Sequence, residues 1–375
     1  MSVPQEHKTE RLWSPLFIFI IIMTLCSFMV GQGLNSGTSV YLDHMGQGAT
    51  LAGILAAVFS ASAAVARIAC GPVIDNVGRV VVMLGGTLCL FVGAILPAFV
   101  SDTTVFTLCR ILQGIGFSAA TTASATAASD VLPLSRLGEG IGYYGLGQAL
   151  AMSIGPALAL FLVNTNPAEN LYLGMSAMAA LAIVFTLLCR YEKNPTRLPE
   201  TSSYRQRIEC EAAGDANGEG AAEAEAEAAK IGAAAAESAT AEAEAEAPKV
   251  PAKKEGFLKS FFEPRAVPGM LPMLVLSPAF GFGIFFMGLY GTSLGYAGAG
   301  LFYTVSAIAM IAVRLVSKAF MDRVAPFKIM TFTVLFGLIG FAMVFFAGQS
   351  ELLFYAAGIP YGLCLGIAIP LNQSV

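Results

Sequence analysis

The sequence is poor in charged residues, and this scarcity excludes most classes of soluble protein. Only 12% of its 375 residues are Asp, Glu, Lys or Arg, whereas 56% belong to the apolar set AVILMFWYC. Soluble domains carry roughly 25% charged and about 45–50% apolar residues. Because the interior of a chain of this length has no room for so much apolar surface, the composition predicts an integral membrane protein.

Residues and motifs on which many enzymes depend are also scarce. The two histidines, His7 and His44, lie outside the apolar runs, and no GxxxxGK[ST] sequence offers a phosphate-binding loop. The seven cysteines form no CxxC pair, which argues against a disulfide framework or a metal site. We therefore expect a protein that is not an enzyme, needs no cofactor or metal, and binds no nucleic acid.

Apolar runs long enough to cross a bilayer are, by contrast, frequent. About twenty apolar residues span the hydrocarbon core as one helix, and lone glycines or prolines within such a helix are tolerated. The first run follows Lys8 and Arg11, but it has spanning length and lacks the small-residue cleavage site of a signal peptide. We expect ten membrane helices, at roughly 16–37, 48–71, 79–100, 103–128, 138–163, 169–190, 268–292, 296–320, 326–347 and 350–372.

The basic residues indicate how these helices are oriented. The loops at one side contain no Lys or Arg, and the basic residues gather at the other ends of the helices. Because positive residues favour the cytoplasmic side, we expect a multi-pass protein of a cell membrane, the bacterial plasma membrane, with both termini in the cytoplasm. The basic residues are Arg67, Arg79, Arg136, Arg190, Lys193, Arg314, Lys318, Arg323 and Lys328.

One long polar segment separates the helices into two groups. Residues 209–246 hold eleven acidic residues and one lysine in an Ala/Glu-rich tract, a net charge of −10 against −4 for the whole chain. Such a tract has too few apolar residues to fold by itself. We expect a six-helix bundle at 1–190, a disordered cytoplasmic linker at 191–267 and an incomplete bundle of four helices at 268–375. A regulatory or partner-binding helix is the alternative for the linker.

The two groups of helices are related by an internal repeat. ARIACGPVIDNVGRVVVM at 66–83 aligns with VRLVSKAFMDRVAPFKIM at 313–330, which pairs Arg67 with Arg314 and Asp75 with Asp322. Parallel halves of this kind are typical of transporters, whose substrate site lies near the midplane between the halves.

The first copy of the repeat contains a loop motif, GPVIDNVGR at 71–79. Its glycines suit a tight reversal, and its aspartate can sit against a helix N-terminus. The motif resembles the loop between helices 2 and 3 of the major facilitator superfamily, with Asn76 and Val80 where the family usually has basic residues. The resemblance implies a conformational latch against the second bundle, near helix 11, while the second copy would face helix 5. The expected latch residues are Gly71, Asp75, Gly78, Arg79, Arg314, Asp322 and Arg323.

A second motif places a charge inside an expected membrane helix. In RILQGIG at 110–116, Arg110 lies well inside the span 103–128. An arginine at a helix centre costs about 2.5–3.5 kcal/mol on insertion scales, so it usually faces a cavity and serves a function. The stretch resembles the helix 4 motif of the same superfamily, which implies that Arg110 takes part in proton coupling or binds an anionic group. The alternative is that its side chain snorkels to the nearer membrane surface.

Small residues recur at every fourth position in the expected helix 138–163, which allows close helix contact. Gly147, Gly155 and Pro156 resemble the Gly/Pro motif of exporters in the superfamily, although Ala151 and Ala159 stand where glycines are expected. Packing without further function is the alternative.

Polar and aromatic side chains within the expected helices are further candidates. Four amides are candidates for lining a cavity, and the alternative is that they form ordinary hydrogen bonds between helices: Gln32, Asn35, Gln113 and Gln148. Five aromatic residues are candidates for lining an apolar pocket, and the alternative is that they only pack against lipid or the core: Phe282, Phe285, Phe286, Tyr290 and Tyr303.

Together these observations predict an all-α integral membrane protein with a two-bundle fold of the major facilitator type, six helices plus four. The family has six helices in each half, so we expect helices 11 and 12 to be absent from this chain. The expected function is secondary active transport of a small molecule (a drug, sugar or metabolite) by alternating access, with export favoured and protons as candidate partners. Import of sugars or organic acids, and a non-transporting remnant or membrane sensor, are the alternatives. We expect a monomer surrounded by lipid.

Overall fold

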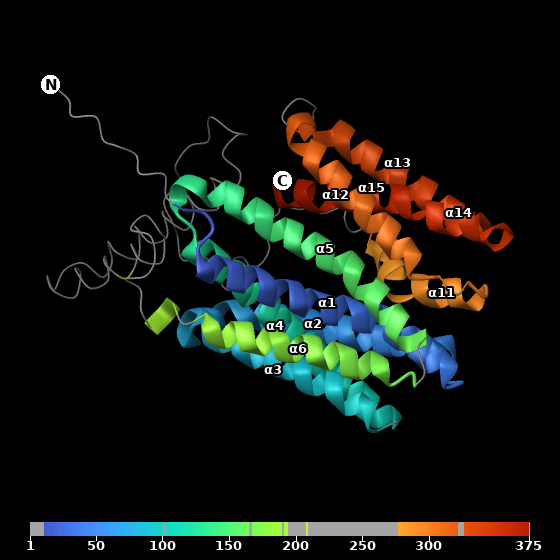
Figure 1. Ribbon diagram of the computed structural model, residues 1–375, viewed down its shortest axis with the longest axis horizontal. Coiled ribbons are helices and arrows are strands. Elements are labelled where there is room, and N and C mark those ends of the chain that lie inside the picture. The colour runs from blue at the N-terminus through green and yellow to red at the C-terminus, as the bar shows by residue number, and fades with distance from the viewer. Residues whose placement is uncertain are drawn as a thin grey trace, which may run out of the picture.

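The computed structural model describes residues 11–100, 102–164, 167–189, 191–193, 208, 277–296, 298–321 and 326–374. These residues are nearly all helical, and Figure 1 shows the helices running side by side in two groups. We call the end at which α1 begins and α2 ends the linker end. The end at which α1 ends and α2 begins is the opposite end.

The first group contains six long helices. Two of them begin at side-chain caps: the Ser14 hydroxyl accepts from the backbone N–H of Phe17, and the Asp102 carboxylate accepts from those of Thr104 and Val105. The helices are α1 (Pro15–His44), α2 (Gly48–Val77), α3 (Arg79–Ile95), α4 (Thr103–Val131), α5 (Leu137–Asn164) and α6 (Asn170–Leu188). A short 3-10 turn, η3 (Tyr191–Lys193), follows α6.

The second group contains shorter helical pieces. Its elements are a helix at 277–285, α11 (Met287–Ser293), α12 (Leu301–Met321), α13 (Pro326–Phe345), α14 (Glu351–Ala356) and α15 (Gly358–Ser374). The packing order of the first group recurs here, because α2 and α3 both contact α4, while α12 and α13 both contact α15. This recurrence agrees with the repeat at 66–83 and 313–330.

Six described helices are long and apolar enough to cross a membrane: Pro15–His44, Gly48–Val77, Arg79–Ala98, Leu134–Asn164, Asn170–Leu188 and Lys328–Gln349. Helix α4 is as long as its neighbours but is not among them, because Arg110, Gln113 and many Ala, Ser and Thr residues lower its hydropathy. It packs against α1, α2 and α3, so it needs no continuous apolar surface. Large apolar side chains are exposed on these six helices and also on α4, at Leu108, Ile111 and Ile115, as lipid contact requires.

Two expected spans are each divided into two pieces. The span 268–292 breaks at Phe286, and the span 350–372 breaks at Ala357. Helix α1 is also longer than the expected 16–37, and α2 continues past the expected end at residue 71 as far as Val77. Hydropathy locates an apolar run but does not report the backbone conformation within it. The two breaks and the exact helix ends could therefore not be predicted from the apolar pattern.

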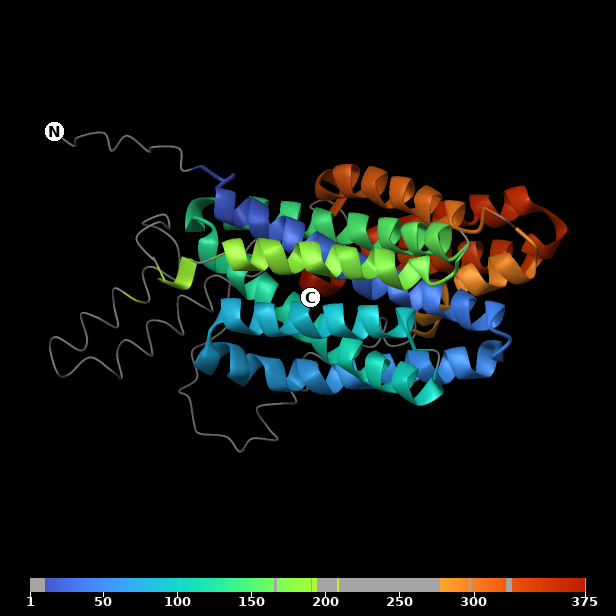
Figure 2. The same ribbon diagram turned by 60° about the horizontal axis from the view of Figure 1, so that its bottom comes forward.

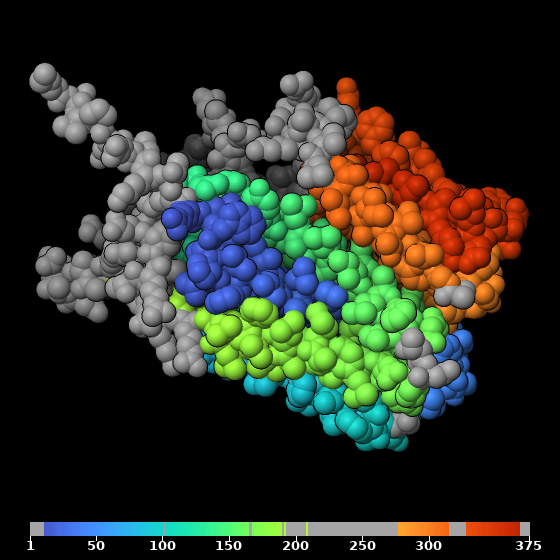
Figure 3. All heavy atoms as spheres, viewed as in Figure 1, coloured from blue at the N-terminus to red at the C-terminus, as the bar shows by residue number. Residues whose placement is uncertain are grey.

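The two groups meet along α1 and α5. Helix α5 packs against α1 on one side and against α12 on the other. Figure 3 shows the orange spheres of α12 lying directly on the green spheres of α5, and Figure 2 shows α2 and α3 on the far side of α1 from α12. One core cluster contains residues of both groups, including Leu34, Leu160, Met287 and Phe302. The core is thus continuous across the boundary between the bundles.

Candidate functional site

A buried arginine lies inside the first bundle. The side chain of Arg110 on α4 is 3% exposed. Its Nη1 donates to Oε1 of Gln113 at 2.9 Å, and Nε2 of Gln113 donates to the carbonyl of Gly93 on α3 at 2.6 Å. The guanidinium carbon lies 5.0 Å from the ring centroid of Phe59 on α2, within the range of a cation–π contact.

This arginine is incompletely satisfied. Within the part of the chain that the structure describes, Arg110 forms no ion pair and its Nε has no hydrogen-bond partner. A buried charge needs compensating groups, and an oxygen anion is the partner that a guanidinium binds best. The burial of Arg110 does not fit a side chain that snorkels to the membrane surface. The arrangement suits an incoming carboxylate or phosphate.

Three aromatic side chains pack against one another near this arginine. The ring of Tyr172 on α6 lies 5.0 Å from that of Tyr41 and 5.8 Å from that of Phe106, and its hydroxyl donates to Oγ1 of Thr38 at 3.3 Å. Neither Phe59 nor Tyr172 was a candidate from the sequence. They come from α2 and α6, and no spacing along the chain relates them to Arg110.

Two amides of α1 lie at the boundary between the bundles. Gln32 and Asn35 are 7% and 2% exposed, and their side-chain carbonyl oxygens have no hydrogen-bond partner among the described residues. One helical turn further on, Ser36 and Ser39 bond to residues of the second bundle. Because residues four apart share a helix face, both amides belong to the face of α1 that meets the second bundle. The side-chain oxygens of Gln32 and Asn35 thus form no hydrogen bond between helices among the described residues.

The small residues of α5 serve close packing. A Cβ atom on Gly155 would lie 2.7 Å from the carbonyl oxygen of Met29 on α1, whereas one on Gly147 would lie 3.5 Å from Ile21. Pro156 is buried within α5. Gln148 is half-buried on the same helix, one turn after Tyr144, whose hydroxyl lies 2.9 Å from the hydroxyl of Ser124 on α4. This part of the exporter-like motif therefore brings α1 and α5 together.

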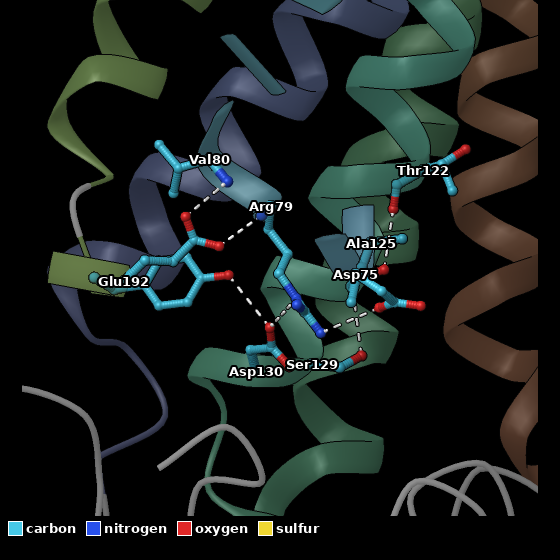
Figure 4. Close-up of polar contacts among 10 residues, drawn as sticks. Asp75, Arg79, Val80, Thr122, Ala125, Ser129, Asp130 and Glu192 are labelled. Atoms are coloured by element: carbon cyan, nitrogen blue, oxygen red, sulfur yellow. Dashed lines mark hydrogen bonds and ion pairs between the residues drawn. The ribbon is translucent and has the colours of Figure 1, made fainter. Parts of the chain in front are cut away.

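A second polar cluster lies at the linker end, around Arg79 (Figure 4). Its Nε donates to Oδ2 of Asp130 on α4 at 3.1 Å, and its Nη2 lies 3.7 Å from Oδ1 of Asp75. The hydroxyl of Tyr191 donates to the same oxygen of Asp130 at 3.3 Å. Arg79 and Asp130 are 6% and 8% exposed, so this ion pair is largely shielded from solvent.

A carboxylate that follows α6 caps α3 in this cluster. Both oxygens of Glu192 accept backbone N–H groups of α3, from Arg79 at 2.5 Å and from Val80 at 3.3 Å (Figure 4). Gly78 makes the reversal with φ +103°, and a Cβ there would lie 3.1 Å from the Glu192 carboxylate. Glu192 was missed because the sequence assigned it to the linker.

The structure places several latch candidates differently from the expectation. Gly71 lies inside α2, so only Gly78 of the two glycines makes the turn. Arg79 bonds within its own bundle, to Asp130 and Asp75. Arg314 does bridge the bundles, because its Nη1 donates to the carbonyl of Gly145 on α5 at 2.8 Å. Asp322 and Arg323 lie outside the described residues.

An open apolar groove of about 410 Å³ lies between α2 and the broken helix of the second bundle. Three of the five aromatic residues suggested as pocket-lining, Phe282, Phe285 and Phe286, line it. Tyr290 and Tyr303 instead donate to the carbonyls of Val344 and Gly283. The full lining is Gly53, Ala56, Ala57, Ser60, Pro278, Gly281, Phe282, Phe285 and Phe286.

Two repeated helical bundles, with buried polar groups between them, define a multi-pass membrane transporter fold. The family model of the Major Facilitator Superfamily matches residues 20–375, and the chain belongs to that superfamily.

Three matches with known proteins agree with this membership. The Staphylopine export protein of Staphylococcus aureus is 23% identical over 94% of this chain and 79% of its own length. The Probable L-galactonate transporter of Escherichia coli is 21% identical over 50% of this chain and 42% of its own length. The solved structure of the xylose transporter XylE from E. coli, in a partially occluded inward-open conformation, matches with a TM-score of 0.61 at 14% identity and covers 96% of this chain and 90% of that chain. At this identity the last match shows the fold alone.

Proposed function

We propose that this protein is a secondary active transporter that exports a small molecule carrying an acidic group, by alternating access between its two bundles. The observation that carries the proposal is the buried Arg110, whose Nε lacks a partner among the described residues. Burial of a cation without an anion is unfavourable, so the site gains most from a ligand that supplies oxygen acceptors. Gln113 holds the guanidinium in place by its bond from Nη1.

The amides of α1 complete the proposed substrate site. Gln32 and Asn35 offer side-chain oxygens at the boundary between the bundles, where alternating access exposes the substrate to each side in turn. The aromatic rings of Phe59 and Phe117, 5.9 Å apart, offer apolar surface beside them. A small, partly apolar organic acid combines the groups that these side chains bind.

The direction of transport is proposed from the relatives. The exporter from Staphylococcus aureus matches nearly the whole chain, which supports export. The L-galactonate transporter matches half of the chain and supports the alternative, import of an organic acid. A proton remains the proposed coupling partner. The carboxylates of Asp43 and Glu139 are exposed, and Glu139 pairs with Arg136 at 2.8 Å, so neither is a buried group that could carry the proton between the bundles.

The experiment compares export by cells that express the wild type, Arg110→Ala or Arg136→Ala in a strain depleted of efflux pumps. Mass spectrometry of the medium identifies acidic metabolites that accumulate only with the wild type, and flux in everted vesicles then measures them directly. Arg136→Ala is the matched control, since it removes an arginine that pairs on the surface.

We expect Arg110→Ala to abolish export at normal expression, and Arg136→Ala to preserve it. Equal export by the wild type and Arg110→Ala would remove the buried arginine from the mechanism. Uptake in place of efflux would reverse the proposed direction while leaving the site intact.

A further inference from the structure

The first described helix of the second bundle is interrupted at Phe286. The helix at 277–285 and α11 are separated at Phe286, where φ is −121° and ψ is −12°. In a continuous helix the carbonyls of Gly283 and Phe285 would accept the N–H groups of Met287 and Leu289. A carbonyl that loses its partner in a membrane interior must find another donor.

Side chains from two other helices supply donors at this break. The hydroxyl of Tyr303 on α12 donates to the carbonyl of Gly283 at 2.8 Å, and the hydroxyl of Ser39 on α1 donates to the carbonyl of Phe285 at 2.8 Å. A third hydroxyl, that of Ser36, lies 3.1 Å from the hydroxyl oxygen of Tyr303. All three side chains are at most 3% exposed, so water does not take their place.

Two of these contacts join the bundles. Ser36 and Ser39 belong to α1 in the first bundle, whereas Tyr303 and Phe285 belong to the second. The packing around them is tight: a Cβ on Gly288 would lie 2.8 Å from Leu160 and 2.9 Å from Ser36. The Ser36–Tyr303 and Ser39–Phe285 hydrogen bonds therefore exist only while the two bundles are in contact here.

We propose that Ser36, Ser39 and Tyr303 form a clasp that couples closure of the opposite end to the break in the helix at Phe286. When the end is closed, the clasp satisfies the carbonyls of Gly283 and Phe285 and the helix stays broken. When the bundles part, α1 withdraws its two hydroxyls. The carbonyl of Phe285 then recovers the N–H group of Leu289, and Tyr303, which has lost its contact with Ser36, releases the carbonyl of Gly283 to the N–H group of Met287 as the helix straightens. The clasp residues are positioning residues, and this inference rests on the proposed alternating access.

The test measures conformation rather than transport. Spin labels are attached at Gln47→Cys, between α1 and α2, and at Gln349→Cys, between α13 and α14, in a background whose native cysteines are serine. Both positions are exposed and lie at the opposite end, one in each bundle. Double electron–electron resonance then measures the distance between the two labels. We call the fraction of molecules with the longer distance, in which the bundles have separated at this end, the parted fraction.

Ser39→Ala and Tyr303→Phe are each expected to raise the parted fraction about fivefold. Each variant removes a hydrogen bond between the bundles, and a bond with a net value of about 1 kcal/mol changes a two-state equilibrium by about that factor. Ser39→Thr retains the hydroxyl and should restore the wild-type distribution. Tyr296→Phe is the matched control, because its hydroxyl donates to the carbonyl of Ala347 within the second bundle.

Unchanged distances in both clasp variants, or an equal shift in Tyr296→Phe, would overturn the clasp. That result would leave the transport proposal intact, because the Arg110 assay is made on unlabelled protein. Conversely, export that survives Arg110→Ala would refute the substrate site without affecting the measured distances.

Discussion

Replacing Gly155 by alanine should push α1 away from α5. The new Cβ would lie 2.7 Å from the carbonyl oxygen and 2.9 Å from the Cα of Met29, and these are backbone atoms that cannot rotate aside. Reaching an ordinary contact of 3.4 Å requires a shift of about 0.7 Å between the two helices. Overpacking of this kind costs typically 1–3 kcal/mol, and a rigid backbone neighbour places it in the upper half of that range, about 2–3 kcal/mol.

The same substitution at Gly147 provides the control. Its Cβ would lie 3.5 Å from a methyl group of Ile21, which is an ordinary contact. Alanine is preferred over glycine inside a helix by about 0.5–1 kcal/mol, and both variants gain this amount. The free energies of unfolding of the two variants should therefore differ only by the cost of overpacking, about 2–3 kcal/mol. At about 2 °C for each kcal/mol, this difference corresponds to roughly 4–6 °C in Tm.

A thiol-reactive dye can follow this unfolding in detergent, because Cys26 on α1 and Cys364 on α15 are each 1% exposed and react only when the helices separate. We expect Gly147→Ala to unfold at or slightly above the wild-type temperature and Gly155→Ala clearly below it. Equal midpoints for the two variants would show that the close approach of α1 and α5 does not limit stability.

Three further predictions concern the linker end and the helix caps. Glu192→Ala should lower Tm by more than Glu192→Gln, because glutamine keeps one oxygen for the N–H groups of Arg79 and Val80; equal losses would contradict the capping role. The N–H groups of Val105 and Thr104 lower the pKa of the Asp102 carboxyl. The contribution of this helix cap to the stability of the protein should therefore be present above pH of about 4 and vanish as the pH falls through the lowered pKa. Melting curves of Asp102→Ala and the wild type should accordingly differ at pH 7 and converge in acid, while curves that stay parallel at every pH would argue against it. Deleting residues 194–267 and joining the ends by a flexible Gly/Ser linker of equal length should preserve export; lost export with normal expression would favour the sensor alternative.

The positions of the helices were largely predictable from the sequence, because a run of apolar residues long enough to span lipid has few other structures open to it. The break at Phe286 was not predictable in this way. No proline lies at that residue, and the donors that stabilise the break, Ser39 and Tyr303, come from distant helices.

The candidate site was predictable only in part. Arg110 stood out because a charge within an apolar run is costly, and Gln113 stood out with it as part of the same motif. The cation–π partner Phe59 gave no signal, since one more phenylalanine in a membrane helix resembles any other. Glu192 gave none either, because a carboxylate at the start of an acidic linker is expected to be solvated.

The buried arginine and the clasp are connected through the contact between two aromatic rings. Phe59 lies beneath the guanidinium of Arg110, and its centroid is 6.3 Å from that of Phe285, whose carbonyl accepts the Ser39 hydroxyl. A ligand anion that takes the place of the Phe59 ring beside Arg110 must therefore also disturb the packing on Phe285, at the edge of the helix break. Ligand binding shifts a conformational equilibrium only when the ligand prefers one state, and the Phe59–Phe285 contact supplies a physical reason for such a preference. On this reasoning, Phe59→Ala should still bind an acidic ligand at Arg110, but the parted fraction at the opposite end, measured with the same spin labels, should no longer respond to that ligand.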